Sequence, residues 1–162
     1  QGLGLIENRY GVTGRGVCAS GRERCGAIVS GACHVTPPRL LLDTHIALWW
    51  FSGNARLGAE IREEIGRSEC WLSAVSVWEV AIKFRLDKLP VAPRALLEAA
   101  RAGGFRLLPI TLDHAAATVD LPSFHADPFD RLLLAQARQE QLTLLTADAS
   151  LAAYGPNVRH LQ

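Results

Sequence analysis

From Arg39 to the end of the chain, short apolar runs alternate with longer segments of helical periodicity. The apolar runs lie at 39–42, 69–73, 106–110, 142–146 and 158–161. Runs of this length indicate buried strands, and strands separated by helices need crossover connections, which join parallel neighbours. The sequence therefore predicts an α/β fold, a three-layer α/β/α sandwich with a mostly parallel sheet.

The segments between these runs carry the patterns of helices. They lie at 44–51, 55–67, 74–85, 93–102, 112–119, 127–141 and 150–154. The segment 127–141 has the strongest pattern, with Pro128 at a first-turn position that tolerates its missing N–H group. In the segment 55–67, apolar side chains recur every four residues, which indicates an amphipathic helix.

Residues 1–38 differ from the rest of the chain. They are rich in Gly, hold three of the four Cys and lack a sustained hydrophobic period. The gaps between Cys18, Cys25 and Cys33 are wider than the C-x₂₋₄-C spacing of a structural zinc site. The sequence contains no Met, and Val35 fits a bacterial GTG start codon, which encodes Met in vivo but is written as Val in a translated sequence. We therefore expect 1–38 to be an unstructured or mis-annotated extension ahead of one domain at 39–162.

The charge balance argues against a broad nucleic-acid or membrane surface. Seventeen Lys and Arg residues oppose sixteen Asp and Glu residues, for a formal net charge of +1. No apolar run reaches the length that spans a bilayer, and no signal-peptide pattern opens the chain. The expectation is a cytoplasmic protein with no membrane partner, in which a local patch or a bound metal supplies positive charge.

Four carboxylates lie close to the ends of predicted strands. Asp43 directly follows the first strand, and Asp148 lies two residues beyond the fourth. Glu79 lies in the helix after the second strand, and Asp130 lies in the first turn of the helix that leads to the fourth. Ligands of open α/β sheets bind beyond the carboxyl ends of the strands, so these four are expected to converge. No Cys or His accompanies them at ligand spacing, which predicts a hard ion, Mg²⁺ or Mn²⁺.

Three of these carboxylates also have a purely structural explanation. Asp43 and Asp148 each precede a predicted helix, where an Asp side chain commonly caps the first turn. Glu79 precedes Lys83 by four residues, and such a pair contributes a few tenths of a kcal/mol on an exposed helix.

Asp130 is the most informative of the four. It shares a helix face with Leu133, Leu134 and Ala137, where an acid is costly to bury unless a cation or hydrogen-bond donors satisfy it. Asp127 lies nearer the edge of that face, where the helix dipole accounts for it without any function. We therefore interpret Asp130, rather than Asp127, as the functional residue of this segment.

Other polar and aromatic residues carry weaker signals. His45 and His125 fall near the expected site, and each is interpreted as a hydrogen-bonded loop or helix-start residue. Arg131 fits a phosphate contact or a pair with a neighbouring acid equally well.

Together these segments resemble the PIN-domain VapC toxins of bacterial type II toxin–antitoxin pairs. The resemblance runs from about Arg39 to Leu161, with the family's motifs in order. The motifs are Leu41-Leu-Asp-Thr-His45 with Ile-Ala-Leu-Trp49, Ser76-Val-Trp-Glu-Val-Ala-Ile-Lys83, His125-Ala-Asp-Pro-Phe-Asp-Arg131 with Leu-Leu-Leu-Ala-Gln-Ala137, and Leu145-Thr-Ala-Asp148.

The resemblance implies a PIN fold and a Mg²⁺- or Mn²⁺-dependent endoribonuclease that inhibits translation. It places the family's catalytic and metal-binding acids on Asp43, Glu79, Asp130 and Asp148. Further candidates for substrate contacts within the motifs are Thr44, Ser76, Arg131 and Thr146. The implied partners are an RNA substrate, a VapB-type antitoxin and a second copy of the chain in a homodimer.

Three other functions stay open from the sequence. One is a PIN-like nuclease that processes RNA outside toxin–antitoxin systems, and another is a non-catalytic α/β interaction module whose acids only cap helices. The third is a phosphatase of the HAD type with Asp43 as nucleophile. That chemistry needs a second Asp two residues later, where this chain has His45.

Overall fold

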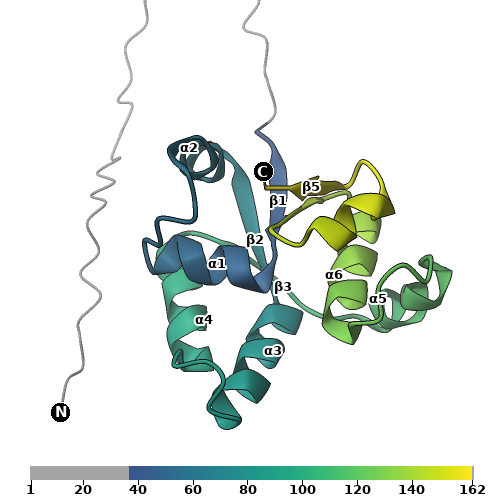
Figure 1. Ribbon diagram of the computed structural model, residues 1–162, viewed down its shortest axis with the longest axis horizontal. Coiled ribbons are helices and arrows are strands. Elements are labelled where there is room, and N and C mark those ends of the chain that lie inside the picture. The colour runs from purple at the N-terminus through teal and green to yellow at the C-terminus, as the bar shows by residue number, and fades with distance from the viewer. Residues whose placement is uncertain (1–36, 162) are drawn as a thin grey trace, which may run out of the picture. The chain divides into compact units, whose positions relative to one another are not determined.

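One sheet of five strands organises the computed structural model, which describes residues 37–161 (Figure 1). The strands are β1 (Arg39–Leu42), β2 (Glu69–Ser73), β3 (Arg106–Leu108), β4 (Thr143–Thr146) and β5 (Val158–His160). Their order is β3-β2-β1-β4-β5, and every neighbouring pair is parallel. This confirms the α/β prediction, with a wholly parallel sheet. The interpretation of residues 1–36, including the three Cys residues there, lies outside the described residues.

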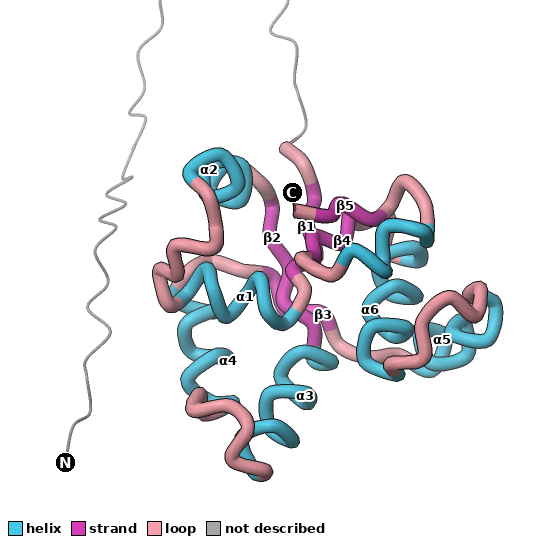
Figure 2. Tube along the Cα trace, in the orientation of Figure 1, coloured by secondary structure: helices cyan, strands magenta, loops and turns pink. Residues whose placement is uncertain are grey.

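Helices and loops connect the strands (Figure 2). The helices are α1 (Thr44–Phe51), α2 (Ala59–Arg67), α3 (Ala74–Arg85), α4 (Pro93–Ala102), α5 (Leu112–Ala116) and α6 (Pro128–Gln139). Two 3₁₀ helices complete the described chain, η1 (Ala117–Asp120) and η2 (Ala149–Tyr154). No helix within residues 37–161 has the length and apolar character needed to cross a membrane.

Several boundaries differ from those expected, each for a local reason. The helix predicted at 55–67 begins only at Ala59, because Asn54 accepts hydrogen bonds from the backbone N–H groups of Arg56 and Leu57 and forms a turn. The strand predicted at 106–110 ends at Leu108, since Pro109 has no N–H group for the ladder.

Both faces of the sheet are buried, which accounts for the uninterrupted apolar strands. Along β1, Leu40 and Leu42 pack into one core while Leu41 packs into the other. The first core receives side chains from α1, α2 and α4, and the second receives side chains from α6 and η2. The three-layer arrangement follows directly from this double burial.

The position of β1 fixes where a ligand can bind. From this central strand the chain builds β2 and β3 on one side and then β4 and β5 on the other. Parallel sheets of this kind have a crevice at the carboxyl ends of the two strands where the direction of winding changes. Here these strands are β1 and β4, and the two segments that follow them are those of Asp43 and Asp148.

Candidate active site

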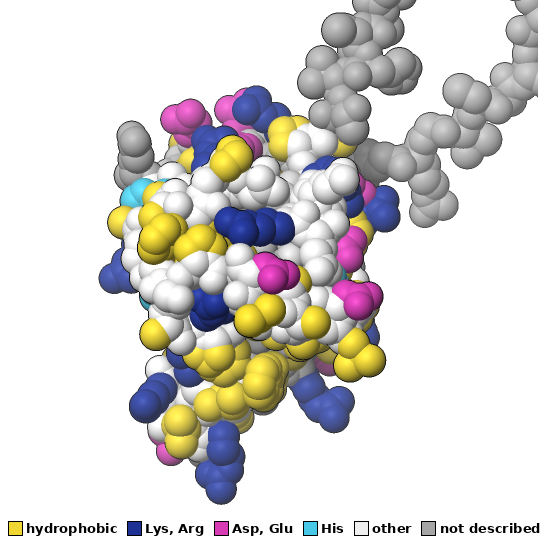
Figure 3. Space-filling model, turned by 90° about the vertical axis from the view of Figure 1, so that its right-hand side faces the viewer, with side chains coloured by type: hydrophobic (Ala, Val, Ile, Leu, Met, Phe, Trp, Pro, Cys, Tyr) yellow, Lys and Arg dark blue, Asp and Glu magenta, His cyan; other side chains and the backbone are white. Residues whose placement is uncertain are grey.

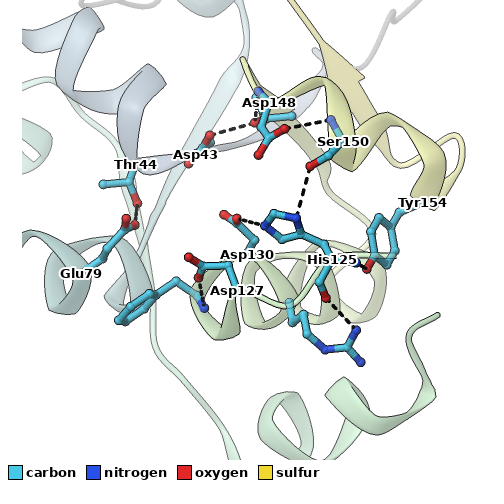
Figure 4. A network of polar contacts seen from close by, with 12 residues as sticks. Asp43, Thr44, Glu79, His125, Asp127, Asp130, Asp148, Ser150 and Tyr154 are labelled. Atoms are coloured by element: carbon cyan, nitrogen blue, oxygen red, sulfur yellow. Dashed lines mark hydrogen bonds and ion pairs between the residues drawn. The ribbon is translucent and has the colours of Figure 1, made fainter. Parts of the chain in front are cut away.

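A cavity of about 250 Å³ lies at this edge of the sheet. Eight side chains line it: Asp43, His45, Glu79, Lys83, His125, Asp127, Asp130 and Asp148. The structure thus brings together all four carboxylates singled out in the sequence. Figure 4 shows that they reach the cavity from the end of β1, from α3, from the start of α6 and from the segment after β4.

Asp43 is buried and is not a helix cap. It occupies the N-cap position of α1, yet its side chain makes no capping hydrogen bond. Its Oδ2 instead accepts a hydrogen bond of 2.8 Å from the Thr146 hydroxyl at the end of β4. Burial raises the pKa of the Asp43 carboxyl, and repulsion from Glu79 adds to this effect, while the Thr146 hydrogen bond opposes it.

Glu79 is also buried and has two partners. The Thr44 hydroxyl donates to Oε2 at 2.6 Å, and the Lys83 ammonium lies 2.5 Å from Oε1. The Glu79–Lys83 pair expected from the spacing is therefore present, but it lies in the cavity rather than on an open helix face. The Ser73 hydroxyl caps the first turn of α3 by accepting from the Val75 N–H and so fixes where this helix begins.

Asp130 lies in the first turn of α6 and faces the cavity. Burial raises its pKa from 3.8 to about 6, and repulsion from Asp43 contributes to the rise. Asp127 behaves differently, because it is the N-cap of α6 and accepts a hydrogen bond of 2.8 Å from the Phe129 N–H. The two acids of this segment thus divide their roles, although the carboxylate of Asp127 also borders the cavity.

Asp148 combines a capping role with a place in the cavity. Its carboxylate is exposed and accepts a hydrogen bond of 2.8 Å from the Ser150 N–H at the start of η2. Hydrogen bonds from Ser150 lower the pKa of Asp148. The backbone N–H of Asp148 donates to the Thr146 hydroxyl, which itself donates to Asp43. Thr146 therefore links the two acids that follow the central strands.

His125 belongs to the site, which corrects the expectation that no His accompanies the acids. Its Nε2 lies 2.6 Å from Asp130 Oδ2, and its Nδ1 lies 3.2 Å from the Ser150 hydroxyl. Ligand atoms of His125, Asp130 and Asp148 all lie within 4.8 Å of one another. The sequence pattern could not place His125 beside Asp130. Residues 121–127 form a loop, so the helical period does not relate these two positions.

The donor set fits a divalent cation. Carboxylates crowd one cavity, and the pKa values of Asp43 and Asp130 are raised, so the hydrogen bonds to these two acids do not fully compensate their charged forms. A cation supplies that compensation, and oxygen donors suit Mg²⁺ or Mn²⁺.

A protein-family model described as a PIN domain matches residues 40–155. The chain belongs to the PIN-domain family. Over 118 residues this PIN domain is 33% identical to "Ribonuclease VapC22" of Mycobacterium tuberculosis (strain ATCC 25618 / H37Rv). That alignment covers 71% of this chain and 91% of the relative. The resemblance found in the motifs is thereby confirmed.

Solved structures share the fold of this PIN domain. VapBC2 from Rickettsia felis, bound to a fragment of promoter DNA, aligns with a TM-score of 0.57 at 13% identity and covers 76% of this chain and 98% of its own. A toxin–antitoxin complex from Klebsiella pneumoniae aligns with a TM-score of 0.53 at 23% identity, covering 74% and 95%.

Three of the predicted substrate contacts of this PIN domain are buried side chains. Thr44 and Thr146 are buried, and their hydroxyls donate to Glu79 and Asp43. Ser76 is fully buried within α3, and its hydroxyl has no hydrogen-bond partner. Because buried hydroxyls do not meet a substrate, we assign Thr44 and Thr146 to orienting carboxylates.

Arg131 holds the loop that carries His125. Its guanidinium donates to four backbone carbonyls, those of Thr118, Leu121, Pro122 and His125. Tyr154 of η2 adds to this anchoring, since its hydroxyl accepts from the His125 N–H and donates to the Pro122 carbonyl. The guanidinium of Arg131 is thus engaged by the backbone rather than free for phosphate.

Proposed function

We propose that this PIN domain is a Mg²⁺- or Mn²⁺-dependent endoribonuclease that acts as the toxin of a type II toxin–antitoxin pair. One observation carries the proposal: Asp43, Glu79, Asp130 and Asp148 surround a single cavity at the carboxyl ends of β1 and β4. The 33% identity to a protein named as a ribonuclease supports the same reaction class.

The chain's own residues hold and orient the reacting groups. Asp43 and Asp130 are the proposed direct metal ligands, because burial leaves each carboxylate in need of a cation. Glu79 and Asp148 would hold water in the site by accepting its hydrogen bonds, or would help to hold a second ion. When bound, a divalent ion lowers the pKa of a coordinated water and neutralises charge on the phosphodiester as it is attacked.

Hydroxyls and an imidazole keep these acids in place. Thr146 fixes Asp43, and Thr44 fixes Glu79, so the two buried carboxylates keep one orientation before substrate arrives. His125 holds the Oδ2 atom of Asp130 through Nε2, while its Nδ1 contacts the Ser150 hydroxyl. The catalytic arrangement is thus largely pre-formed in the free chain.

Two protein partners belong to the proposal. The solved relatives described as toxin–antitoxin complexes support a VapB-type antitoxin. Exposed apolar side chains support a homodimer, since large patches of this kind mark protein interfaces. On α3 the exposed large apolar side chains are Trp78, Ile82 and Phe84. Hydrophobic side chains also gather on the lower part of the face shown in Figure 3.

RNA cleavage with and without a chelator tests the proposal. Purified protein is incubated with structured RNA in Mn²⁺, in Mg²⁺ and in EDTA, with Asp43→Asn as the inactive control. Cleavage is expected in either metal, and neither EDTA nor the variant should support it. Cleavage that persists in EDTA would exclude the metal-dependent reaction. Failure of Mn²⁺ to bind the wild-type chain in calorimetry would instead favour a non-catalytic module whose acids are structural.

A further inference from the structure

Lys83 occupies an unusual position in the acidic cavity. Five of the side chains that line the cavity are carboxylates and two are imidazoles, so Lys83 is the one permanent cation among these eight lining residues. Its ammonium lies 2.5 Å from Glu79 Oε1, and about a third of its side chain is exposed. The ammonium therefore contacts a buried acid and at the same time borders solvent.

A polyanionic strand that enters this cavity needs compensation for the carboxylates. Arg131 does not provide it, because its guanidinium already donates to four backbone carbonyls. An ammonium has three N–H donors, and Glu79 Oε1 accepts one of them. Lys83 thus has donors left over at the open side of the cavity.

We propose that Lys83 is a phosphate-binding residue of the RNA site. In the free protein its ammonium neutralises Glu79, and in the complex its remaining N–H groups donate to a non-bridging oxygen of a backbone phosphate above the acids. The inference rests on the proposed function and adds to it a residue that contacts substrate. It also explains how a chain of net charge +1 holds RNA beside clustered carboxylates.

The competing explanation is that Lys83 only stabilises Glu79. Glu79 is nearly buried, so an ion pair with Lys83 serves the fold whether or not RNA binds. The two explanations differ in one measurable quantity. A phosphate contact contributes to the salt dependence of RNA binding, whereas a purely internal ion pair does not.

The experiment measures RNA binding without cleavage. A short fluorescein-labelled single-stranded RNA is titrated with the full chain in EDTA, by anisotropy, at several KCl concentrations. The variants are Lys83→Gln and Lys83→Arg, with Lys88→Gln as the matched control. Lys88 is exposed, lies five residues further along the chain and does not line the cavity, so its substitution removes the same charge elsewhere.

Lys83→Gln is expected to weaken binding and to reduce the slope of log affinity against log salt by about 0.7, the value for one contact with a single strand. Lys83→Arg should keep the slope, and Lys88→Gln should match the wild type. The double variant Glu79→Gln/Lys83→Gln removes both charges of the pair and so controls for an unpaired buried acid. It should lose the same slope as the single Lys83 variant.

The outcomes separate this inference from the proposed function. If folded Lys83→Gln shows the same salt dependence of RNA binding as the wild type, Lys83 only stabilises Glu79 and does not contact phosphate. This conclusion holds even if the wild type cleaves RNA in Mn²⁺. If Lys83→Gln reduces the salt dependence of RNA binding while the wild type binds RNA without cleaving it, the phosphate contact is supported. The proposed nuclease activity is then refuted. A wild type that neither binds nor cleaves RNA would overturn both.

Discussion

Replacing Asp130 with Asn is expected to stabilise the metal-free protein at neutral and alkaline pH. Burial and the charge of Asp43 raise the pKa of Asp130 from 3.8 to about 6. Between these two values the folded chain binds more protons than the unfolded chain, so its stability falls as pH rises. The penalty is fully present at pH 7 and above, and it becomes small as the pH falls to 4 and below. Asp130→Asn removes the titration and with it the penalty.

The magnitude follows from the size of the pKa shift. A change of about 2 pKa units corresponds to about 3 kcal/mol, and water reaching the fifth of the side chain that is exposed reduces this to about 1–3 kcal/mol. For a domain of roughly 125 residues, 1 kcal/mol displaces the melting temperature by about 4 °C. At pH 8 in EDTA, Asp130→Asn should therefore melt about 4–12 °C above the wild type.

The assay is urea denaturation in EDTA at pH 8 and pH 4, with Asp127→Asn as the control of equal charge change. Asp130→Asn should be the more stable protein at pH 8, and most of its advantage over the wild type should be lost at pH 4. Saturating Mn²⁺ should reverse the order at pH 8, because only the wild type gains binding energy from the ion. An Asp130→Asn protein with wild-type stability at both pH values would refute the argument from burial.

Three further predictions concern activity and the loop. In single-turnover cleavage of RNA, Asp130→Asn should be inactive and Asp127→Asn should stay active. By urea denaturation, Asp127→Asn should lose at most about 1 kcal/mol of stability. An inactive Asp127→Asn and an active Asp130→Asn would exchange the roles of the two acids. Arg131→Gln removes hydrogen bonds to four carbonyls and should lower both the melting temperature and the Mn²⁺ affinity measured by calorimetry, because the loop carries His125. If Arg131→Gln binds Mn²⁺ with the affinity of the wild type, the loop that carries His125 does not contribute to metal binding. Expression of the chain without an antitoxin should arrest bacterial growth, and Asp43→Asn at equal expression should not; equal toxicity would remove Asp43 from the mechanism.

The positions of the acids could be predicted because they depend on short-range rules. Asp43 and Asp148 follow two strands, and parallel strands present their carboxyl ends at one edge of a sheet. Helical phase placed Asp130 on the buried face of α6 and left Asp127 at the edge, and the structure agrees. Each of these inferences used either the helical period or the rule that parallel strands end at one edge of a sheet.

The contribution of His125 could not be predicted in this way. Its place depends on a loop that is closed by Tyr154, which follows it by 29 residues, and by the hydrogen bonds of Arg131. Spacing along the chain says nothing about such a closure, since no repeating geometry links the partners. The same applies to Thr44 and Thr146, whose hydroxyls looked available for substrate and are taken by carboxylates from other elements.

The pairing of β1 with β4 has a consequence for how the active protein comes into being. Leu40 pairs with Thr143, so the centre of the sheet joins segments separated by most of the domain. Contacts of such long sequence separation form late and slowly. A chain that stops before His125 carries only Asp43 and Glu79 of the four proposed catalytic acids and lacks the strand that supplies Thr146. We therefore expect fragments that end before His125 to lack nuclease activity, so that activity would depend on the last quarter of the chain.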